Sequence, residues 1–294
     1  MHFSLRHLTQ YTYSEPVSDS MNDVHLCPVS DEFQICHSFD LLIDPACHSI
    51  LRRLDFYTNQ VHHFEVIELH KVLRVEAVST VETFEDSRDL GVLSNSADLI
   101  ELKRSERFYD FLNASERVPL LPMVIHEYSE LFPTVIEDAQ GAVLKIMDYI
   151  YREFRYDTGA TTVETPFEVM FESRRGVCQD FAHAMLALCR ASGIPARYVS
   201  GYFYLENIQS GTAEDNTQSH AWVECFLPGI GWLGFDPTHN RRVDTRYIKI
   251  AVGRDYSDVR PLAGTFRGSA IASLEVMVQI ERVEEAEALS RRHS

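Results

Sequence analysis

Alternating hydrophobic and polar residues dominate the first part of the chain and predict β-strands. Residues 70–84 show this pattern best. Leu73, Val75 and Ala77 fall on one face of an extended chain, whereas the charged Glu76 falls on the other. Such alternation is typical of a strand with one face buried and one face in water.

Two further segments in this part have the same character. Residues 33–43 form a strand candidate that ends before Pro45, and residues 51–68 have the composition of a hairpin that turns near Asn59. With the apolar and aromatic positions at the start of the chain, they predict an antiparallel β domain over residues 1–84.

A helical period replaces this alternation in the middle of the chain. Ile146 and Ile150 belong to a series of apolar residues at helical spacing, which predicts a helix over residues 135–154. Short helical pieces are expected near residues 105–112 and 122–131, in an acidic connecting region that contains several prolines.

Strand patterns return near the C-terminus, in the segments IKIAVGRDY and LEVMVQI. We assign these strands and the connecting helices to a second domain over residues 85–280, and we expect residues 281–294 to form a polar tail. The predicted fold class is therefore α+β, with an antiparallel β domain first.

The segment RRGVCQDFAHAMLALCRASGIPARYVSGY, residues 174–202, predicts a helix with a cysteine at its start. Apolar residues at spacings of three and four give the helix one buried face, and Gly193, soon followed by proline, ends it. Cys178 therefore lies in the first turn and Cys189 in the last. The free N–H groups and partial positive charge of a helix N-terminus favour a thiolate at Cys178 and suit a developing oxyanion. Gly176 allows the tight backbone entry that leaves the sulfur accessible.

A thiolate nucleophile needs an imidazole partner and a group that holds the ring. His183 lies about 140° around the helix from Cys178 and cannot face the sulfur. Asp180, in the first turn, is expected to complement the helix dipole. His220 is a better partner, because it opens SHAWVECFLPGIGWLGFDP, which has the pattern of a β-hairpin that ends at Asp236.

His220 and Asp236 share a face of this hairpin only if its loop has an odd number of residues or contains a bulge. With a three-residue Pro-Gly-Ile loop, Leu227 pairs with Gly231. Asp236 then lies opposite Trp222 and one diagonal step from His220, which a carboxylate and an imidazole can bridge.

Composition and charge narrow the classes of partner. The chain has 27 Lys and Arg against 44 Asp and Glu, a formal net charge of −17. We therefore expect neither nucleic acid nor a membrane surface as partner, because both attract clustered positive charge. Residues 1–159 hold 13 basic and 27 acidic residues, whereas residues 160–250 hold 8 and 10. The negative charge belongs mainly to the part that precedes the candidate chemistry.

The start of the chain lacks an apolar segment with a cleavage site, and no run approaches the roughly 18 apolar residues of a membrane span. We therefore expect a soluble, cytoplasmic protein with reduced thiols. None of the six cysteines stands in a CxxC pair. The adjacent His62 and His63 are expected at the surface on opposite faces of a strand, so no metal site is predicted.

These residues resemble the transglutaminase-like superfamily, and more narrowly its bacterial members described as cysteine proteases. The matching stretches are the cysteine helix, SHAWVECFLPGIGWLGFDPTHN and RYIKIAVGRDYSDVRPLAGTFRG, and the opening strands resemble the β domain of that bacterial group. The resemblance implies a papain-like fold, with a nucleophile helix packed on an antiparallel sheet. It also implies that Cys178 is the nucleophile, that His220 is the general base and then the acid, and that Asp236 orients His220.

The resemblance implies no cofactor. The large extra β domains of the calcium-dependent animal enzymes and the zinc-binding CxxC pairs of the peptide N-glycanases have no counterpart in this sequence. Calcium activation and deglycosylation are therefore not implied.

Two further residues are candidates for substrate binding. Trp222 alternates onto the face of His220, so it either lines the cleft or packs in the core. Tyr156, ahead of the nucleophile helix, either donates a hydrogen bond to the oxyanion or packs as an ordinary tyrosine. Cys189 and Cys225 are expected in the core.

The main hypothesis is a cysteine-dependent amide hydrolase or acyltransferase that acts on a peptide or protein through an acyl-enzyme at Cys178. Water as the second substrate gives a peptidase or amidase, which we favour because no feature identifies a lysine-binding channel. An amine gives a cross-linking transglutaminase. A non-catalytic interaction module that retains the fold, and acyl transfer to a small molecule as in arylamine N-acetyltransferases, are the alternatives. The sequence does not predict the oligomeric state.

Overall fold

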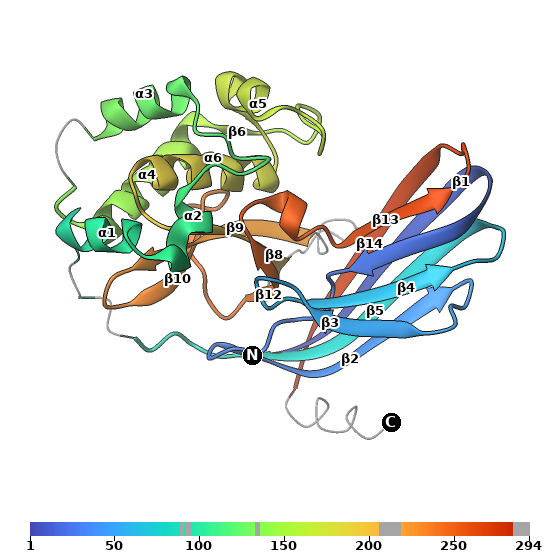
Figure 1. Cartoon of the computed structure of the whole chain (residues 1–294). Coiled ribbons are helices and arrows are strands. Elements are labelled where there is room, and N and C mark those ends of the chain that lie inside the picture. The colour runs from blue at the N-terminus through green and yellow to red at the C-terminus, as the bar shows by residue number, and fades with distance from the viewer. Residues whose placement is uncertain (89–90, 92–93, 95, 133–135, 206–218, 285–294) are drawn as a thin grey trace.

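The chain forms two lobes that lie side by side (Figure 1). The computed structural model describes residues 1–88, 91, 94, 96–132, 136–205 and 219–284. One lobe is built from long strands, and the other carries the helices α1 to α6 against a second sheet (Figure 1). The fold is α+β, as the sequence predicts.

The first lobe, called the β lobe below, is built on one long strand. Its elements are β1 (His2–Val24), β2 (Gln34–Asp44), β3 (Ile50–Leu54), β4 (Gln60–Val66), β5 (His70–Thr83), β13 (Leu262–Arg267) and β14 (Ala272–Val283). The first half of β1 pairs with β5 and β14, and its second half pairs with β4 and β13. All these pairs are antiparallel, and β1 therefore belongs to both halves of the lobe.

Alternation along the strands builds the core of the β lobe. Leu73, Val75 and Ala77 are buried, as predicted, and they pack with Val17 and Phe64 from the neighbouring strands. The predicted hairpin is also present, because β3 and β4 pair antiparallel across the turn that contains Asn59. His62 is buried against the ring of Phe39, so the surface position expected for it is wrong. It packs there because this face of β4 is covered by β2.

The C-terminal strands belong to the β lobe and not to the second lobe, which corrects the expected domain limits of 85–280. β13 and β14 both hydrogen-bond to β1, and the pairing with β14 runs from His2–Val283 to Tyr13–Ala272. The polar tail also begins later than expected, because residues 281–283 are still part of β14. Residues 285–294 lie outside the described part of the chain.

The second lobe, called the core lobe below, is a sheet covered by helices. Its strands are β8 (Ala196–Phe203), β9 (Ser219–Leu227), β10 (Gly231–Asp236), β11 (Arg241–Arg242) and β12 (Tyr247–Gly253), in the antiparallel order β11-β10-β9-β8-β12. Its helices are α1 (Ser96–Lys103), α2 (Tyr109–Leu112), α3 (Pro122–Leu131), α4 (Ala139–Glu153), α5 (Phe167–Ser173) and α6 (Cys178–Ala191). The short 3-10 helices are η1 (Glu106–Phe108) and η2 (Tyr256–Asp258), and β6 (Arg155–Tyr156) pairs with β7 (Arg175–Gly176). α6 packs on β8 and β9 with an almost fully buried face.

Local sequence signals account for most helix limits. α3 has the predicted bounds, with Pro122 at its first position. α4 begins at Ala139 rather than at residue 135, because the side chain of Asp138 accepts hydrogen bonds from two N–H groups of the first turn. Val135 lies outside the described residues. The short helices α1 and α5 were not predicted.

Two buried amide side chains join the lobes along the edge strand β12. The amide of Gln34 donates to the carbonyl of Lys249 at 2.9 Å and accepts from its N–H at 2.8 Å. Asn59 makes the same two contacts with Val252, both at 2.8 Å. The side chains thus continue the hydrogen-bond ladder beyond the edge of the core sheet, which leaves these backbone groups satisfied.

Within the described residues, no helix is both long enough and apolar enough to cross a membrane.

Candidate active site

Cys178 is the first residue of α6 and is half-buried. The carboxylate of Asp180 accepts a hydrogen bond from the N–H of Val177 at 2.8 Å and another from the hydroxyl of Thr161 at 2.6 Å. These bonds fix the first turn of the helix, in which the N–H groups of Cys178 and Gln179 have no carbonyl partner inside the helix. The predicted position of Cys178 is confirmed, and Asp180 caps the helix.

Only glycine fits at position 176, two residues before Cys178, because there is no room for a side chain. A Cβ atom at this position would lie 2.3 Å from the Oδ2 atom of Asp180. Asp180 is buried and held by two hydrogen bonds, so it cannot move aside without loss. The glycine therefore permits the close packing of the entering chain against the capping carboxylate.

The other end of α6 also follows the prediction. Gly193 has a φ of 76°, and the N–H of Ile194 donates to the carbonyl of Cys189 at 2.9 Å, which closes the helix end. Cys189 and Cys225 are fully buried, with their sulfur atoms 3.7 Å apart, so both are core residues as expected.

The hairpin that carries His220 has the predicted register. Leu227 pairs with Gly231 across the three-residue loop, and the pairing continues to Phe235–Val223. As a result, Asp236 shares a face with His220, and its Oδ2 atom lies 2.7 Å from the Nε2 atom of His220. Both side chains are buried, at 0% exposure for Asp236 and 8% for His220.

Cys178 lies close enough to His220 to raise the pKa of its imidazole. Because Asp236 occupies Nε2, the nitrogen that remains for the thiol is Nδ1. The structure therefore brings Cys178, His220 and Asp236 together, from the start of α6 and from the two strands of one hairpin. His183 lies elsewhere, with its Nε2 atom accepting from the backbone N–H of Tyr256 at 3.3 Å.

The local charges favour a charged imidazole. Burial alone would lower the pKa of His220, but its hydrogen bond to Asp236 and the proximity of Cys178 raise it to about 10. Burial would raise the pKa of Asp236, but hydrogen bonds from His220 and His239 hold it well below its usual range. At neutral pH the pair is thus an imidazolium beside a carboxylate.

Sequence reasoning missed three further partners of Asp236. The Nδ1 atom of His239 and the hydroxyl of Tyr247 each lie 2.7 Å from the Oδ2 atom of Asp236, and the N–H of Thr238 donates to Oδ1 at 2.8 Å. Burial raises the pKa of Tyr247 beside this carboxylate, so its hydroxyl stays a donor. The only signal in the sequence was proximity, since Thr238 and His239 follow Asp236 closely.

Trp222 packs as a core residue against the histidine. It is 1% exposed, and its ring lies against that of His220, with 6.3 Å between centroids and an angle of 30°. Tyr247 meets the same indole edge-on at 5.3 Å. The predicted shared face of Trp222 and His220 is therefore correct.

Tyr156 lies at the open side of the site and is 45% exposed. It belongs to β6, where it pairs directly with Gly176 of β7. Its pKa is raised by partial burial and then by the charges of Cys178 and Asp180, which marks its closeness to the nucleophile. Its ring also lies against that of Phe181, with 6.1 Å between centroids, so both interpretations of this tyrosine stay open.

A cavity of about 410 Å³ borders the first turn of α6. Gln179 and Asp180 of that turn line it, together with Phe167 and Glu168 of α5 and Arg117. His183 also lines this cavity, whereas Cys178 and His220 do not.

Comparisons with known proteins agree with this architecture. Residues 133–237 match the model of the transglutaminase-like superfamily, and residues 3–82 match that of the bacterial transglutaminase-like N-terminal region. An uncharacterized protein of Mycobacterium leprae is 31% identical over 280 residues, which are 94% of this chain and 97% of that protein. The chain therefore belongs to the transglutaminase-like superfamily, in the bacterial group with this N-terminal region.

Two further relatives bear on fold and chemistry. The crystal structure of a candidate cysteine protease from Cytophaga hutchinsonii superimposes with a TM-score of 0.74 at 24% identity, covering 97% of this chain and 92% of that chain, and so shares the fold. A protein-glutamine gamma-glutamyltransferase of Pseudomonas aeruginosa is 30% identical over 128 residues, which are 40% of this chain and 19% of that protein.

Proposed function

We propose that the protein is a cysteine-dependent amide hydrolase that acts on a peptide or protein through an acyl-enzyme at Cys178. The observation that carries this proposal is the buried hydrogen bond of 2.7 Å between His220 and Asp236, beside a cysteine at a helix N-terminus. A protein that only binds a partner has no need for this arrangement.

The reaction follows from the charges of these groups. The Cys178 thiolate attacks the carbonyl carbon of the amide, and the oxyanion that forms is stabilised by the N–H groups of Cys178 and Gln179. The His220 imidazolium then gives its proton to the departing amine as the C–N bond breaks. The resulting thioester is hydrolysed by a water molecule that His220 deprotonates, which releases the acid and restores the thiolate.

The environment of His220 suits the first of these steps. Its pKa of about 10 keeps the ring protonated at neutral pH, ready to protonate a leaving amine. Asp236 stays ionised and orients the ring, while Trp222 packs against it. We assign to Tyr156, which is half-exposed and close to Cys178, the role of donating a hydrogen bond to the substrate.

Transamidation is a second candidate, favoured by one observation. The relative from Pseudomonas aeruginosa, 30% identical over 128 residues, is a protein-glutamine gamma-glutamyltransferase. The same acyl-enzyme would form there, and a primary amine would replace water as the acceptor. The two activities differ in the fate of the thioester and not in the three residues that form it.

The test is trapping of the acyl-enzyme with a library of peptides, followed by mass spectrometry of the intact protein. Wild type, Cys178→Ala and the control Cys47→Ala, a half-buried thiol of the β lobe, are compared. We expect an adduct and new peptide termini with wild type and Cys47→Ala, and neither with Cys178→Ala. A fluorescent primary amine in the reaction distinguishes the acceptors, because its incorporation into glutamine peptides indicates transamidation. Identical blank profiles for all three proteins would overturn the proposal and favour an interaction module.

A further inference from the structure

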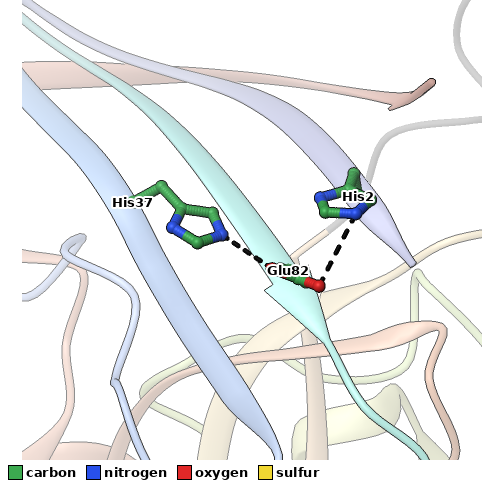
Figure 2. A group of neighbouring side chains, drawn as sticks. All are labelled: His2, His37 and Glu82. Atoms are coloured by element: carbon green, nitrogen blue, oxygen red, sulfur yellow. Dashed lines mark hydrogen bonds and ion pairs between the residues drawn. The ribbon is translucent and has the colours of Figure 1, made fainter. Parts of the chain in front are cut away.

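Three side chains of kinds that can bind a metal converge in the β lobe, and none of them belongs to the candidate active site. His2 of β1, His37 of β2 and Glu82 of β5 point toward one another from three neighbouring strands (Figure 2). The Nε2 atom of His37 lies 2.9 Å from one carboxylate oxygen of Glu82, and that of His2 lies 3.6 Å from the other. The potential ligand atoms all lie within 4.8 Å of one another.

Strand register brings these residues together. Glu82 lies on the central strand of the three, directly opposite His2 on one side and Ile35 on the other. His37 is the extra residue of an irregularity in β2, because its neighbours Cys36 and Ser38 pair with consecutive residues of β5. Such bulges turn a side chain out of the regular ladder, and this one turns an imidazole toward Glu82.

We propose that His2, His37 and Glu82 bind a divalent transition-metal cation of the zinc class. Two imidazole nitrogens and one carboxylate are ligands that zinc accepts, at bond lengths of about 2.0 to 2.2 Å. Tetrahedral geometry then places ligand atoms roughly 3.3 Å apart. The separations of 2.9 and 3.6 Å between the histidine nitrogens and Glu82 bracket this distance, and the ligand atoms of the two histidines lie within 4.8 Å of each other.

The surroundings leave room for a further ligand and favour a cation. The side chains of His2, His37 and Glu82 are 19%, 16% and 25% exposed, so water can reach the fourth position of the metal. The strands lie in the acidic part of the chain, where residues 1–159 hold 27 acidic and 13 basic residues. This excess of negative charge attracts cations.

The second coordination shell predicts a modest affinity. The Nδ1 atom of His2 is buried and has no hydrogen-bond partner in the part of the chain that the structure describes. Metal-binding histidines usually donate that N–H to an acceptor, and loss of the acceptor weakens binding by about 10- to 100-fold. We therefore expect reversible binding that is lost on dialysis against a chelator.

The consequence of binding is structural. The residue after Glu82, Thr83, donates from its hydroxyl to the carbonyl of Thr245 in the core lobe at 2.6 Å. A metal that joins β1, β2 and β5 here would hold together the strands at the point where the chain crosses between lobes. A metal ion that binds the folded protein and not the unfolded chain raises the thermal stability by mass action.

The test is zinc binding by the full chain, measured as metal content after equilibrium dialysis against a zinc buffer and as the shift of Tm. Wild type is compared with His37→Ala and Glu82→Gln, which each remove one ligand. His63→Ala is the matched control, because His63 is also a strand histidine beside carboxylates, at 2.9 Å from Asp23 and 3.5 Å from Glu65. We expect wild type and His63→Ala to bind about one zinc ion more than the other two variants, with a larger rise in Tm on zinc addition than those two show.

Zinc bound elsewhere does not affect this comparison. His220, Asp236 and His239 form another group with possible metal ligands, but that group is intact in all four proteins, so its zinc cancels in the difference. Glu82→Gln keeps the size of the side chain and serves if His37→Ala does not fold. Equal zinc content and equal Tm shifts in wild type, Glu82→Gln and any folded His37→Ala would overturn the proposal.

Discussion

Gly176 and Asp180 together set the position of Cys178. The carboxylate of Asp180 holds the first turn of α6 through Val177 and Thr161, and only a residue without a Cβ atom fits beside it. The position of Cys178 therefore depends on the contact between Gly176 and Asp180 and not on its own side chain.

Replacing Gly176 with alanine should displace that carboxylate. We expect Gly176→Ala to lower the free energy of unfolding by about 1–3 kcal/mol, because a new Cβ atom overlaps Asp180 and two buried hydrogen bonds are strained. The rate of alkylation of Cys178 by iodoacetamide should fall about tenfold as the helix N-terminus loses its fixed geometry. Urea unfolding and peptide mapping by mass spectrometry measure the two effects.

Gly159→Ala is the control for this substitution. A Cβ atom at Gly159 would meet Asp157 at 3.6 Å, which is an ordinary van der Waals contact. Its alkylation rate should match that of wild type. Unchanged reactivity in Gly176→Ala would show that the cap does not position the cysteine.

The three central residues of the site could be predicted because each is marked by local signals. Cys178 stands where a helix-entry glycine meets an apolar period, and His220 and Asp236 open and close one hairpin. His239 and Tyr247 could not be predicted in the same way. Their rings reach Asp236 through the turn after Pro237 and from β12, and neither position is fixed by the alternation of a single strand.

At the scale of elements, strand alternation in the hairpin β9–β10 is enough to predict which side chains share a face. The period of a strand is two, so the length of the loop alone decides which side chains share a face. The short helices α1 and α5 escaped prediction because they are too brief to show a clear period. Strand alternation does not predict what covers the outer edge of β12. There, side chains of the β lobe form hydrogen bonds with the backbone of β12.

The contact of Asn59 with the edge strand β12 predicts how much this one side-chain amide contributes to stability. Asn59→Ala leaves the buried N–H and carbonyl of Val252 without partners, so the free energy of unfolding should fall by about 2–4 kcal/mol in a urea titration. Asn113→Ala is the control, because its exposed amide contacts only the carbonyl of Tyr109 at 2.8 Å, and its effect should stay within about 0.5 kcal/mol. A loss at Asn59 no larger than at Asn113 would mean that water replaces the amide.

At the scale of the whole molecule, one buried histidine links the two lobes. The Nδ1 atom of His7 lies 2.7 Å from the hydroxyl of Tyr202 in β8, and its Nε2 atom lies 3.1 Å from Thr9. Burial lowers the pKa of His7 from 6.5 to about 4. The neutral ring is thus part of the docked state, and its protonation favours the unfolded chain.

The contact should therefore weaken in acid. Because the folded pKa is lower than the unfolded one, the contribution of His7 is complete above pH 6.5 and is lost as the pH falls toward 4. Linkage gives a loss of about 2 kcal/mol between pH 8 and pH 5. Urea unfolding at both pH values should show a smaller loss for His7→Gln than for wild type by about this amount. The similarly lowered pKa of His183 affects both proteins alike. Equal losses in the two proteins would contradict this role.

The partners of the C-terminal strands were beyond sequence reasoning. Alternation in LEVMVQI marks a strand, but pairing with β1 joins residues at opposite ends of the chain, and a local pattern carries no information about such a partner. The domain limit at residue 280 was wrong for this reason, although both lobes were expected.

Removing these strands should expose both edges that they cover on β1. We expect a chain that ends at Pro261 to form large assemblies in size-exclusion chromatography with light scattering, because unpaired strand edges pair with other chains. A chain that ends at Glu284 keeps β13 and β14 and should elute as wild type does. Equal elution of the shorter chain would show that the rest of the lobe protects β1.

Because β1 is shared by both halves of the β lobe, it also affects the order in which the two lobes can fold during synthesis. Synthesis proceeds toward the C-terminus, so β1 leaves the ribosome before the core lobe, and its partners β13 and β14 leave after the core lobe. The whole core lobe, with Cys178, His220 and Asp236, emerges between them. The nascent chain therefore has every residue of its candidate active site available for folding while the lobe beside it still waits for its final strands.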